Sequence, residues 1–251
     1  MTAELFHAGL GWPIALTLIA ASFLGSFITV AFGIGGGQVM LAVFATLLPA
    51  AAIIPVHGLV QLGSNAGRTA LTYRHLKTGV ASLFAVGALI GVGLGTLFFV
   101  QLNPAAIQIG VGLFILWSIL FKPPAFMRRS AGIAGAISSF LTMFFGATGP
   151  FVAAFVTSLR LGKMSHTATH ATLMTIQHTL KTVAFGFLGF AFSLWAGLIG
   201  LLIASGFLGT IVGRRVLVRV DEHRFRLILN VILTLLAARL IYAGTADFLI
   251  T

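Results

Sequence analysis

The sequence predicts an all-α integral membrane protein that contains two inverted repeats of five helical segments each. The chain has 251 residues, of which 59% are hydrophobic and only 8% are charged, and its mean hydropathy is +1.09. Several apolar runs reach the roughly 20 residues that span about 30 Å of hydrocarbon. Glycine-rich interruptions of these runs recur along the chain, and basic loops alternate with neutral ones. Together these three observations predict the fold.

The repeat is visible in two short motifs, which read FGIGGGQ at 32–38 and FGATGP at 145–150. Adding 113 to a position in the first motif gives the matching position in the second. The same offset pairs His57 with His170 and Arg68 with Lys181. A histidine and a cation that recur at one offset are harder to explain by chance than recurring glycines. We therefore expect one transmembrane transporter domain over 1–251, with repeat 1 at about 10–122 and repeat 2 at about 130–245.

Apolar runs bounded by glycine, proline or charge predict ten helical segments. They fall near 14–31, 38–48, 53–73, 79–100, 105–121, 131–144, 150–159, 164–185, 193–213 and 225–243. The segments 38–48 and 150–159 are too short to span, because eleven helical residues rise only about 16 Å at ~1.5 Å each. With the run before it, each short segment predicts a broken helix. The two breaks are expected to meet near the bilayer midplane.

The loops between the segments predict the orientation of the chain. Basic residues gather near 74–77, 122–129, 160–163 and 214–226, whereas the loops near 49–52, 101–104 and 186–192 carry no Lys or Arg. The positive-inside rule places the basic loops in the cytoplasm and the neutral ones outside, with both chain ends outside. Equivalent loops then lie on opposite sides of the membrane, which predicts inverted repeats. The alternative is a parallel arrangement of four plus four helices, in which each broken run is one long helix.

The two motifs predict a binding site for an anion. Within a bilayer, non-helical backbone is tolerated only where protein or a water-filled cavity covers it. The short helices begin at the motifs, and their free amides and positive dipole ends favour anions. The backbone groups expected to bind are those of Gly35, Gly36, Gly37, Gln38, Thr148 and Gly149. The alternative is that the glycines only allow close helix packing.

Polar side chains on one face of two predicted segments would complete this site. Such residues are costly at membrane depth and usually face the interior of the bundle. Those expected to bind the solute are His57, Gln61, Asn65 and Arg68 in the first repeat, and His170, Gln177, His178 and Lys181 in the second. The alternative for the two cations, Arg68 and Lys181, is that they extend to a membrane surface.

The distribution of acidic residues indicates an anionic solute. The four acids of the chain are Glu4, Asp221, Glu222 and Asp247, and none lies inside a predicted segment. Cation pathways and the proton relays of many pumps use carboxylates within the membrane. A coupled proton would therefore travel on the solute or on a histidine, because imidazole titrates near neutral pH.

The sequence offers little support for an enzyme, a metal protein or a nucleic-acid-binding protein. Without cysteine there is no thiol nucleophile and no thiolate ligand, and the basic residues fit topology better than a nucleic-acid partner. No cofactor, resident metal or enzymatic activity is expected. The remaining alternative of this kind is a metal held by His166, His170 and His178, in a membrane metal-binding protein or enzyme.

The chain resembles the TauE/SafE family of sulfite and organosulfonate exporters. The likeness covers nearly the full length and rests on FGIGGG at 32–37, Pro49, YRHLKTG at 73–79 and the second motif, whose GATGP is less rich in glycine. The resemblance implies a multi-pass exporter of small sulfur-containing anions, such as sulfite or sulfoacetate, in the bacterial inner membrane. It also implies coupling to protons, with the solute and the lipid bilayer as partners. A passive anion channel remains an alternative.

Overall fold

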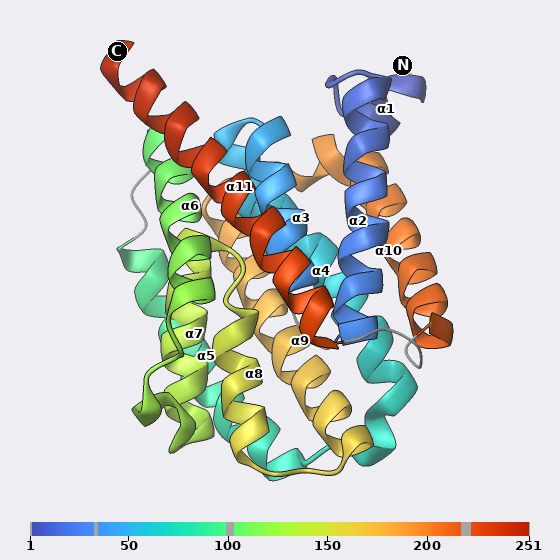
Figure 1. Cartoon of the computed structure of the whole chain (residues 1–251), viewed down its shortest axis with the longest axis vertical. Helices are drawn as coiled ribbons and strands as arrows, with labels where there is room; N and C mark the ends of the chain where they lie inside the picture. Colours follow the sequence, from blue (N-terminus) through green and yellow to red (C-terminus); the bar gives the residue numbers. More distant parts are fainter. Residues whose placement is uncertain (1, 33–34, 99–102, 217–221, 251) are drawn as a thin grey trace. The chain divides into compact units, whose positions relative to one another are not determined.

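The computed structural model describes residues 2–32, 35–98, 103–216 and 222–250, and the regular elements in these ranges are all helices (Figure 1). The predicted all-α class is therefore confirmed. The chain forms two compact units. Unit 1 comprises Met1–His57, Gln101–Phe121 and Ala191–Thr251, and unit 2 comprises Gly58–Val100 and Lys122–Phe190. Each unit draws residues from both halves of the sequence, and the boundary at His57 falls within one helix.

In its described residues, unit 1 contains six complete helices and the beginning of a seventh. They are α1 (Thr2–His7), α2 (Trp12–Phe32), α3 (Gly36–Leu47), the start of α4 (Ala50–Thr72), α6 (Pro104–Leu120), α10 (Ala196–Val216), which follows the 3-10 turn η3 (Phe192–Trp195), and α11 (Glu222–Ile250). Unit 2 contains the rest of α4, η1 (Tyr73–His75), α5 (Thr78–Leu97), η2 (Ala125–Arg128), α7 (Ala131–Phe145), α8 (Gly149–Ser158) and α9 (Lys163–Phe187).

The ten predicted segments correspond to α2 through α11. Within the described residues, four stretches are long and apolar enough to cross a membrane, namely Trp12–Ala31, Thr78–Leu97, Phe192–Gly213 and Leu227–Asp247. The helices α4 and α9 have 23 and 25 residues but carry many polar side chains, so length alone makes them candidates to span. As predicted, α3 and α8 are short, with 12 and 10 residues. The protein is a multi-pass membrane protein.

Both predicted helix breaks are present. Gly35 precedes α3 with φ 101°, and Gly146 ends α7 with φ 79°. Glycine adopts these positive φ angles without the steric cost that a Cβ imposes. Pro150 lies in the first turn of α8, where its missing amide hydrogen interrupts no helical bond. Gly33 and Ile34 of the first motif, and parts of the loops 101–104 and 214–226, lie outside the described residues.

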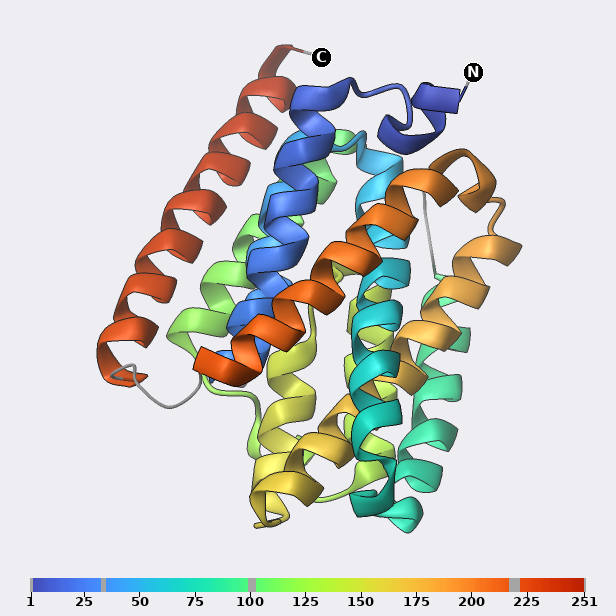
Figure 2. The same cartoon turned by 90° about the vertical axis from the view of Figure 1, so that its right-hand side faces the viewer.

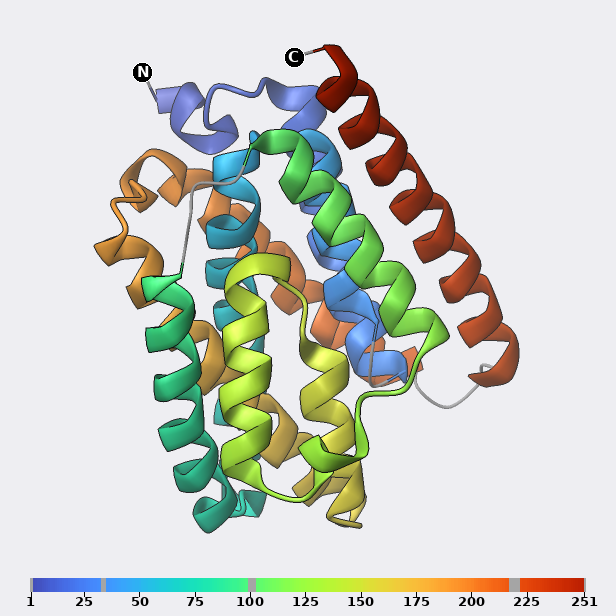
Figure 3. The same ribbon diagram turned by 90° about the vertical axis from the view of Figure 1, so that its left-hand side faces the viewer.

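In unit 2, α5 and α7 are in backbone contact along their length (Figure 3). A Cβ added at Gly87 would overlap the carbonyl oxygen of Gly132, and one added at Gly91 would overlap that of Ala136. Later residues of α5 meet later residues of α7, so the two helices run parallel. Small residues four apart let membrane helices approach in this way.

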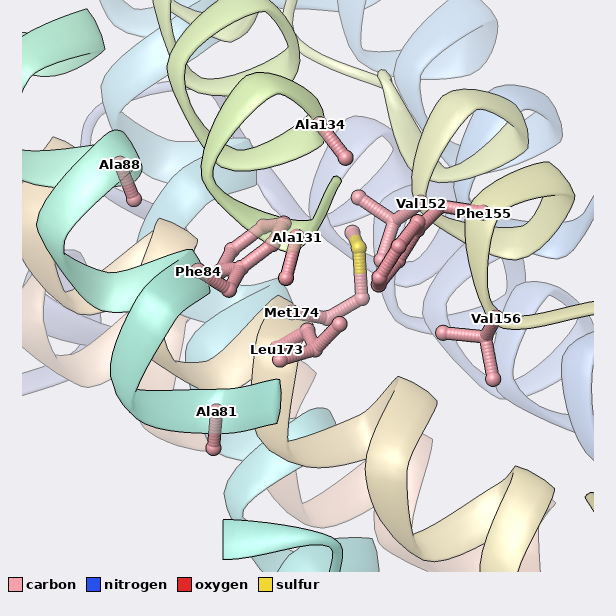
Figure 4. Packing of buried hydrophobic residues seen from close by; sticks show 10 residues of the cluster. All are labelled: Ala81, Phe84, Ala88, Ala131, Ala134, Val152, Phe155, Val156, Leu173 and Met174. Atoms are coloured by element: carbon pink, nitrogen blue, oxygen red, sulfur yellow. The ribbon is translucent and has the colours of Figure 1, made fainter. Parts of the chain in front are cut away.

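The apolar core of unit 2 joins α5, α7, α8 and α9 (Figure 4). Phe84 of α5, Phe155 of α8 and Met174 of α9 are large side chains that lie around the small Ala131 and Ala134 of α7. All five are buried. Alternation of large and small residues fills the space between the helices without voids, and it holds α8 and α9 in fixed positions beside the break that ends α7.

In unit 1, α10 packs in parallel against α2 (Figure 2). Ser205 Oγ donates to Ile19 O over 2.8 Å, and a Cβ at Gly209 would overlap the carbonyl oxygen of Phe23. These contacts match those of α5 with α7. Gly91 of α5 corresponds to Gly209 of α10, which lies 118 residues later in the chain. Ala136 of α7 corresponds to Phe23 of α2, which lies 113 residues earlier. The two helix pairs therefore make contact through equivalent positions.

The helices α6 and α11 make a reciprocal contact in unit 1 (Figure 3). A Cβ added at Gly112 would lie 2.9 Å from Ala237 O, and one added at Gly244 would lie 2.8 Å from Ala105 O. The later residue of each helix meets the earlier residue of the other, so the helices run antiparallel. Adding 132 to Ala105 and Gly112 gives Ala237 and Gly244, so both sides of the contact use equivalent positions.

Candidate functional site

The residues predicted to bind a solute fall into two groups, one in each compact unit. Unit 1 holds Gly35, Gly36, Gly37, Gln38 and His57. Unit 2 holds Gln61, Asn65, Arg68, Thr148, Gly149, His170, Gln177, His178 and Lys181. In unit 1 the predicted residues lie at the start of α3, and in unit 2 contacts join Thr148, Gly149, His170, Gln177 and Lys181 to the break between α7 and α8.

In unit 1, the group surrounds the first turn of α3. His57 Nε2 donates to Gly37 O over 3.0 Å, which fixes the start of α4 against the start of α3. The side chain of Gln38 donates to Ser118 Oγ of α6, while its backbone amide donates to Gly35 O over 3.0 Å. Polar side chains from α4 and α6 therefore hold the beginning of α3 in place.

The glycines of this motif also serve packing. A Cβ added at Gly36 would overlap Gly25 O and the hydroxyl of Thr29 in α2, and one added at Gly35 would lie 2.5 Å from Leu229 of α11. The close-packing role that the sequence left open is therefore present at this break. A small residue here keeps the first turn of α3 against its neighbours.

In unit 2, Lys181 lies at the C-terminal end of α7. Its side chain is fully buried. Its Nζ donates to Thr142 Oγ1 and to Gly146 O, both over 3.4 Å, and the Thr142 hydroxyl donates to the same Gly146 O over 2.6 Å. A helix C-terminus presents unpaired carbonyls and the negative end of the dipole, so it favours an ammonium group. Lys181 therefore does not extend to a membrane surface.

The N-terminal end of α8 is lined by side chains of α9. Gln177 Nε2 donates to Thr148 Oγ1 over 2.8 Å, and both residues are fully buried. Gln177 Oε1 has no hydrogen-bond partner within the described residues. Proline at 150 supplies no amide and Phe151 N donates to Thr148 O, so Gly149 carries the first amide of the helix that is open to a ligand.

His170 lies at this same helix end. It interacts with the backbone of Gly149, and it is close enough to Arg68 to interact with it electrostatically. Its Nε2 has no hydrogen-bond partner in the part of the chain that the structure describes. His178 is fully buried on the same helix, two turns further along. The second motif thus faces amide, imidazole and ammonium groups.

The polar face of α4 is internally hydrogen-bonded. Arg68 Nη2 donates to Asn65 Oδ1 over 2.7 Å, and Asn65 Nδ2 donates to Gln61 O over 2.8 Å. The hydroxyls of Thr69 and Thr175 lie 3.1 Å apart and connect α4 to α9. Hydrogen bonds therefore fix the side chains on the predicted face of α4, and Asn65 orients the guanidinium of Arg68.

Three contributors to the site were not predicted. Thr142 lies one turn before Gly146, Gly58 lies against the Lys181 side chain, and Ser118 holds Gln38. The spacing of Thr142 to Gly146 was the one available signal, because residues four apart share a helix face. Nothing in the sequence marks Gly58 or Ser118, since their roles depend on which helices become neighbours.

The histidines of α9 do not form a metal site in the described residues. No group of three His, Cys, Asp or Glu side chains lies close enough there to hold an ion. The nearest partner of His166 is the hydroxyl of Thr157, 3.4 Å from its Nε2.

Comparison with known proteins identifies one family. The profile of the sulfite exporter TauE/SafE family matches residues 18–240. This confirms the resemblance seen in the sequence. No curated protein and no solved structure gives a significant match to the chain.

Proposed function

Because this chain belongs to the TauE/SafE family of sulfite exporters, we propose that it exports a small sulfur-containing anion by alternating access. Sulfite and sulfoacetate represent the solute class, and transport is coupled to protons. The family is one of membrane transporters, which agrees with the apolar helices of the chain. The protein acts in the bacterial inner membrane as a carrier and not as an enzyme.

The observation that carries this proposal is a buried cation that has no acidic partner among the described residues. Lys181 is fully buried, and the oxygens that it contacts, Thr142 Oγ1 and Gly146 O, are neutral. The whole chain has four acidic residues, none of them in α4, α5, α7, α8 or α9. Burying an uncompensated ammonium is costly, and an anionic solute offsets that cost while it is bound.

The groups at the α8 end suit a sulfur oxyanion. The Gly149 amide, the Gln177 amide group and the Thr148 hydroxyl can each donate to one of several oxygens, and hydrogen bonds to a charged acceptor are about twice as strong as neutral ones. Gln177 and Lys181 are four residues apart on α9, so their side chains are about one helical turn apart. An anion between them would accept hydrogen bonds from both. The remaining predicted binding residues supply further polar contacts.

Inverted repeats are supported by the reciprocal contact between α6 and α11. An axis that exchanges two antiparallel helices is perpendicular to both of them. If both helices cross the bilayer, that axis lies in the membrane plane and inverts one repeat relative to the other. The parallel arrangement would instead exchange helices that run in the same direction.

In the proposed orientation, both ends of the chain lie on the outer side of the membrane. It is supported by the basic loops on the cytoplasmic side. It is also supported by Figure 2, in which α1 and the C-terminal end of α11 lie at the same end of unit 1.

Thermal stability of the detergent-purified protein tests the binding claim. The panel contains sulfite, sulfoacetate, thiosulfate, sulfate, acetate and zinc. A solute that binds only the folded state stabilises it by about 2.7 kcal/mol at a hundredfold excess over Kd. We expect a higher Tm with one or more sulfur oxyanions and no change with acetate. A shift with zinc alone would contradict the anion site and favour a metal-binding protein.

A further inference from the structure

Two acceptors contact the Lys181 amine, and two is the number of N–H groups in its neutral form. Thr142 Oγ1 and Gly146 O each lie 3.4 Å from Nζ. The hydrogen of the Thr142 hydroxyl is already donated to Gly146 O, so the hydroxyl oxygen faces the amine as an acceptor. A neutral amine has two N–H groups and an ammonium has three. The third N–H of the ammonium finds no acceptor among the described residues.

The neighbouring helices leave room for this side chain and provide no counter-charge. A Cβ added at Gly58 of α4 would lie 2.6 Å from Lys181 Cε, so the lysine side chain passes directly over this glycine and would have to shift for a larger residue. The helices α5, α7 and α8 carry no ionisable residue. The remaining ionisable groups on the packed elements are His57 and Arg68 on α4, Tyr73, Arg74 and His75 on η1, and Lys163, His166, His170 and His178 on α9.

None of these groups is a carboxylate. Arg68 is ten residues from Gly58, or about 15 Å along α4. His178 is the nearest in sequence, three residues before Lys181 on α9. The acceptor for the third N–H must therefore come from outside the described protein groups. A bound oxyanion at the α8 end, about one helical turn away, supplies it.

We propose that Lys181 carries the coupling proton and that the anion and the proton move in the same direction. This inference rests on the proposed function of anion transport. With the anion bound, Lys181 is an ammonium whose third N–H donates to an anion oxygen. After the anion leaves, the ammonium gives that proton to water, so that –NH3+ and H2O become –NH2 and H3O+. The neutral amine keeps its two hydrogen bonds to Thr142 and Gly146.

Linkage explains why the two movements are coupled. The bound anion stabilises the ammonium and the ammonium stabilises the bound anion, by the same free energy. The occupied carrier therefore holds both, and the empty carrier holds neither. The step needs no carboxylate within the membrane, which agrees with the absence of acids from these helices.

The test measures protons and anions together in proteoliposomes. The solute is labelled sulfoacetate, whose sulfonate and carboxylate are both ionised above about pH 5, so it carries no proton itself. A trapped pH dye reports internal acidification during uptake, and potassium with valinomycin holds the membrane potential constant. We expect about one proton for each anion in the native chain.

Lys181→Gln is the informative variant, because its amide has two N–H groups for the same two acceptors. We expect it to exchange labelled for unlabelled sulfoacetate more slowly than the native chain, because its amide is uncharged, while the protons moved per anion fall at least tenfold. Gly93→Ala is the control, because nothing lies within 4 Å of a Cβ at this glycine of α5, and it should keep the native ratio. An unchanged proton ratio in Lys181→Gln would overturn the proposal. The proposal would also be overturned if His178→Gln lost proton movement while Lys181→Gln kept it.

If Lys181→Gln does not transport, the proposal is tested by the binding of sulfoacetate to the purified protein. Sulfoacetate should stabilise the native chain less as pH rises from about 6 to about 9, because the neutral amine lacks the third N–H, and its weaker effect on Lys181→Gln should not depend on pH. Equal pH dependence in both would overturn the proposal. Exchange without proton movement in the native chain refutes the inference and leaves anion transport intact. Absence of sulfite and sulfoacetate exchange refutes both.

Discussion

Three side chains determine the chemistry at the break between α7 and α8. Lys181 contacts the carbonyl end of α7, Gln177 contacts the residue that begins α8, and Thr142 connects the lysine to Gly146. A broken helix exposes a negative end and a positive end within a few residues. One face of α9 supplies a cation for the first end and an amide for the second.

Replacing Thr142 by valine removes the hydroxyl that holds Lys181 and Gly146 together. The shape is nearly preserved, but the buried amine of Lys181 loses an acceptor and the buried Gly146 carbonyl loses a donor. We expect a loss of stability of about 1–3 kcal/mol, measured by thermal unfolding of the purified protein. The control is Thr17→Val, whose exposed hydroxyl donates to Pro13 O, and it should change Tm little. Equal Tm values for the two variants would contradict the role of Thr142.

The sequence indicated which polar residues belong to the candidate site, but it did not indicate their contacts. The offset of 113 singled out His170 and Lys181 as expected binding residues, because polar groups are costly at membrane depth and usually mark a site. In the structure both residues contact the second break, and their role in binding stays a prediction. The offset did not reveal that Lys181 binds the end of α7. That contact depends on Thr142 and Gly58, which are ordinary residues in apolar helices until their neighbours are known.

At the level of elements, apolar runs and glycine breaks predicted the helices from α2 to α10 within a few residues, whereas α11 extends to Ile250, seven residues beyond the predicted end at 243. The short α1 was missed, because six residues carry no periodic signal. The pairing of helices could not be predicted either. Small residues occur in most of these helices, and only the structure identifies the stripe of Gly87 and Gly91 as the one that meets α7.

The contact of α5 with α7 can be tested by two glycines of the same helix. Gly91→Leu places a side chain where Ala136 O lies, so the helices must separate. Gly93→Leu places the same side chain in open space and removes a flexible glycine from the helix. We expect Gly91→Leu to lose at least about 2 kcal/mol in thermal unfolding, whereas Gly93→Leu keeps or raises Tm. Similar losses in both would refute the backbone contact.

At the level of the whole molecule, the inverted arrangement is a proposal that loop charge and the reciprocal contact of α6 with α11 support. The two arguments are independent, since one concerns orientation and the other concerns packing. The compact units do not coincide with the sequence repeats, because α5 packs on α7 and α10 packs on α2. Each unit therefore combines helices from both halves, which no pattern in the sequence indicated.

Cysteine labelling tests the inverted arrangement, because the chain has no cysteine of its own. His75→Cys and Leu188→Cys place one exposed thiol after each polar helix. An impermeant maleimide added to intact spheroplasts should label Leu188→Cys alone, and both should be labelled after permeabilisation. Labelling of both from the same side would favour the parallel arrangement.

The central claim is that the protein is a carrier for a sulfur oxyanion, and counterflow tests it most directly. Proteoliposomes are loaded with unlabelled sulfite or sulfoacetate, and uptake of the labelled anion from outside is compared with uptake by empty vesicles. A carrier that alternates its access returns faster when occupied, so we predict transient accumulation of label above equilibrium in the loaded vesicles. Equal uptake by loaded and empty vesicles would contradict the account and favour a passive anion channel.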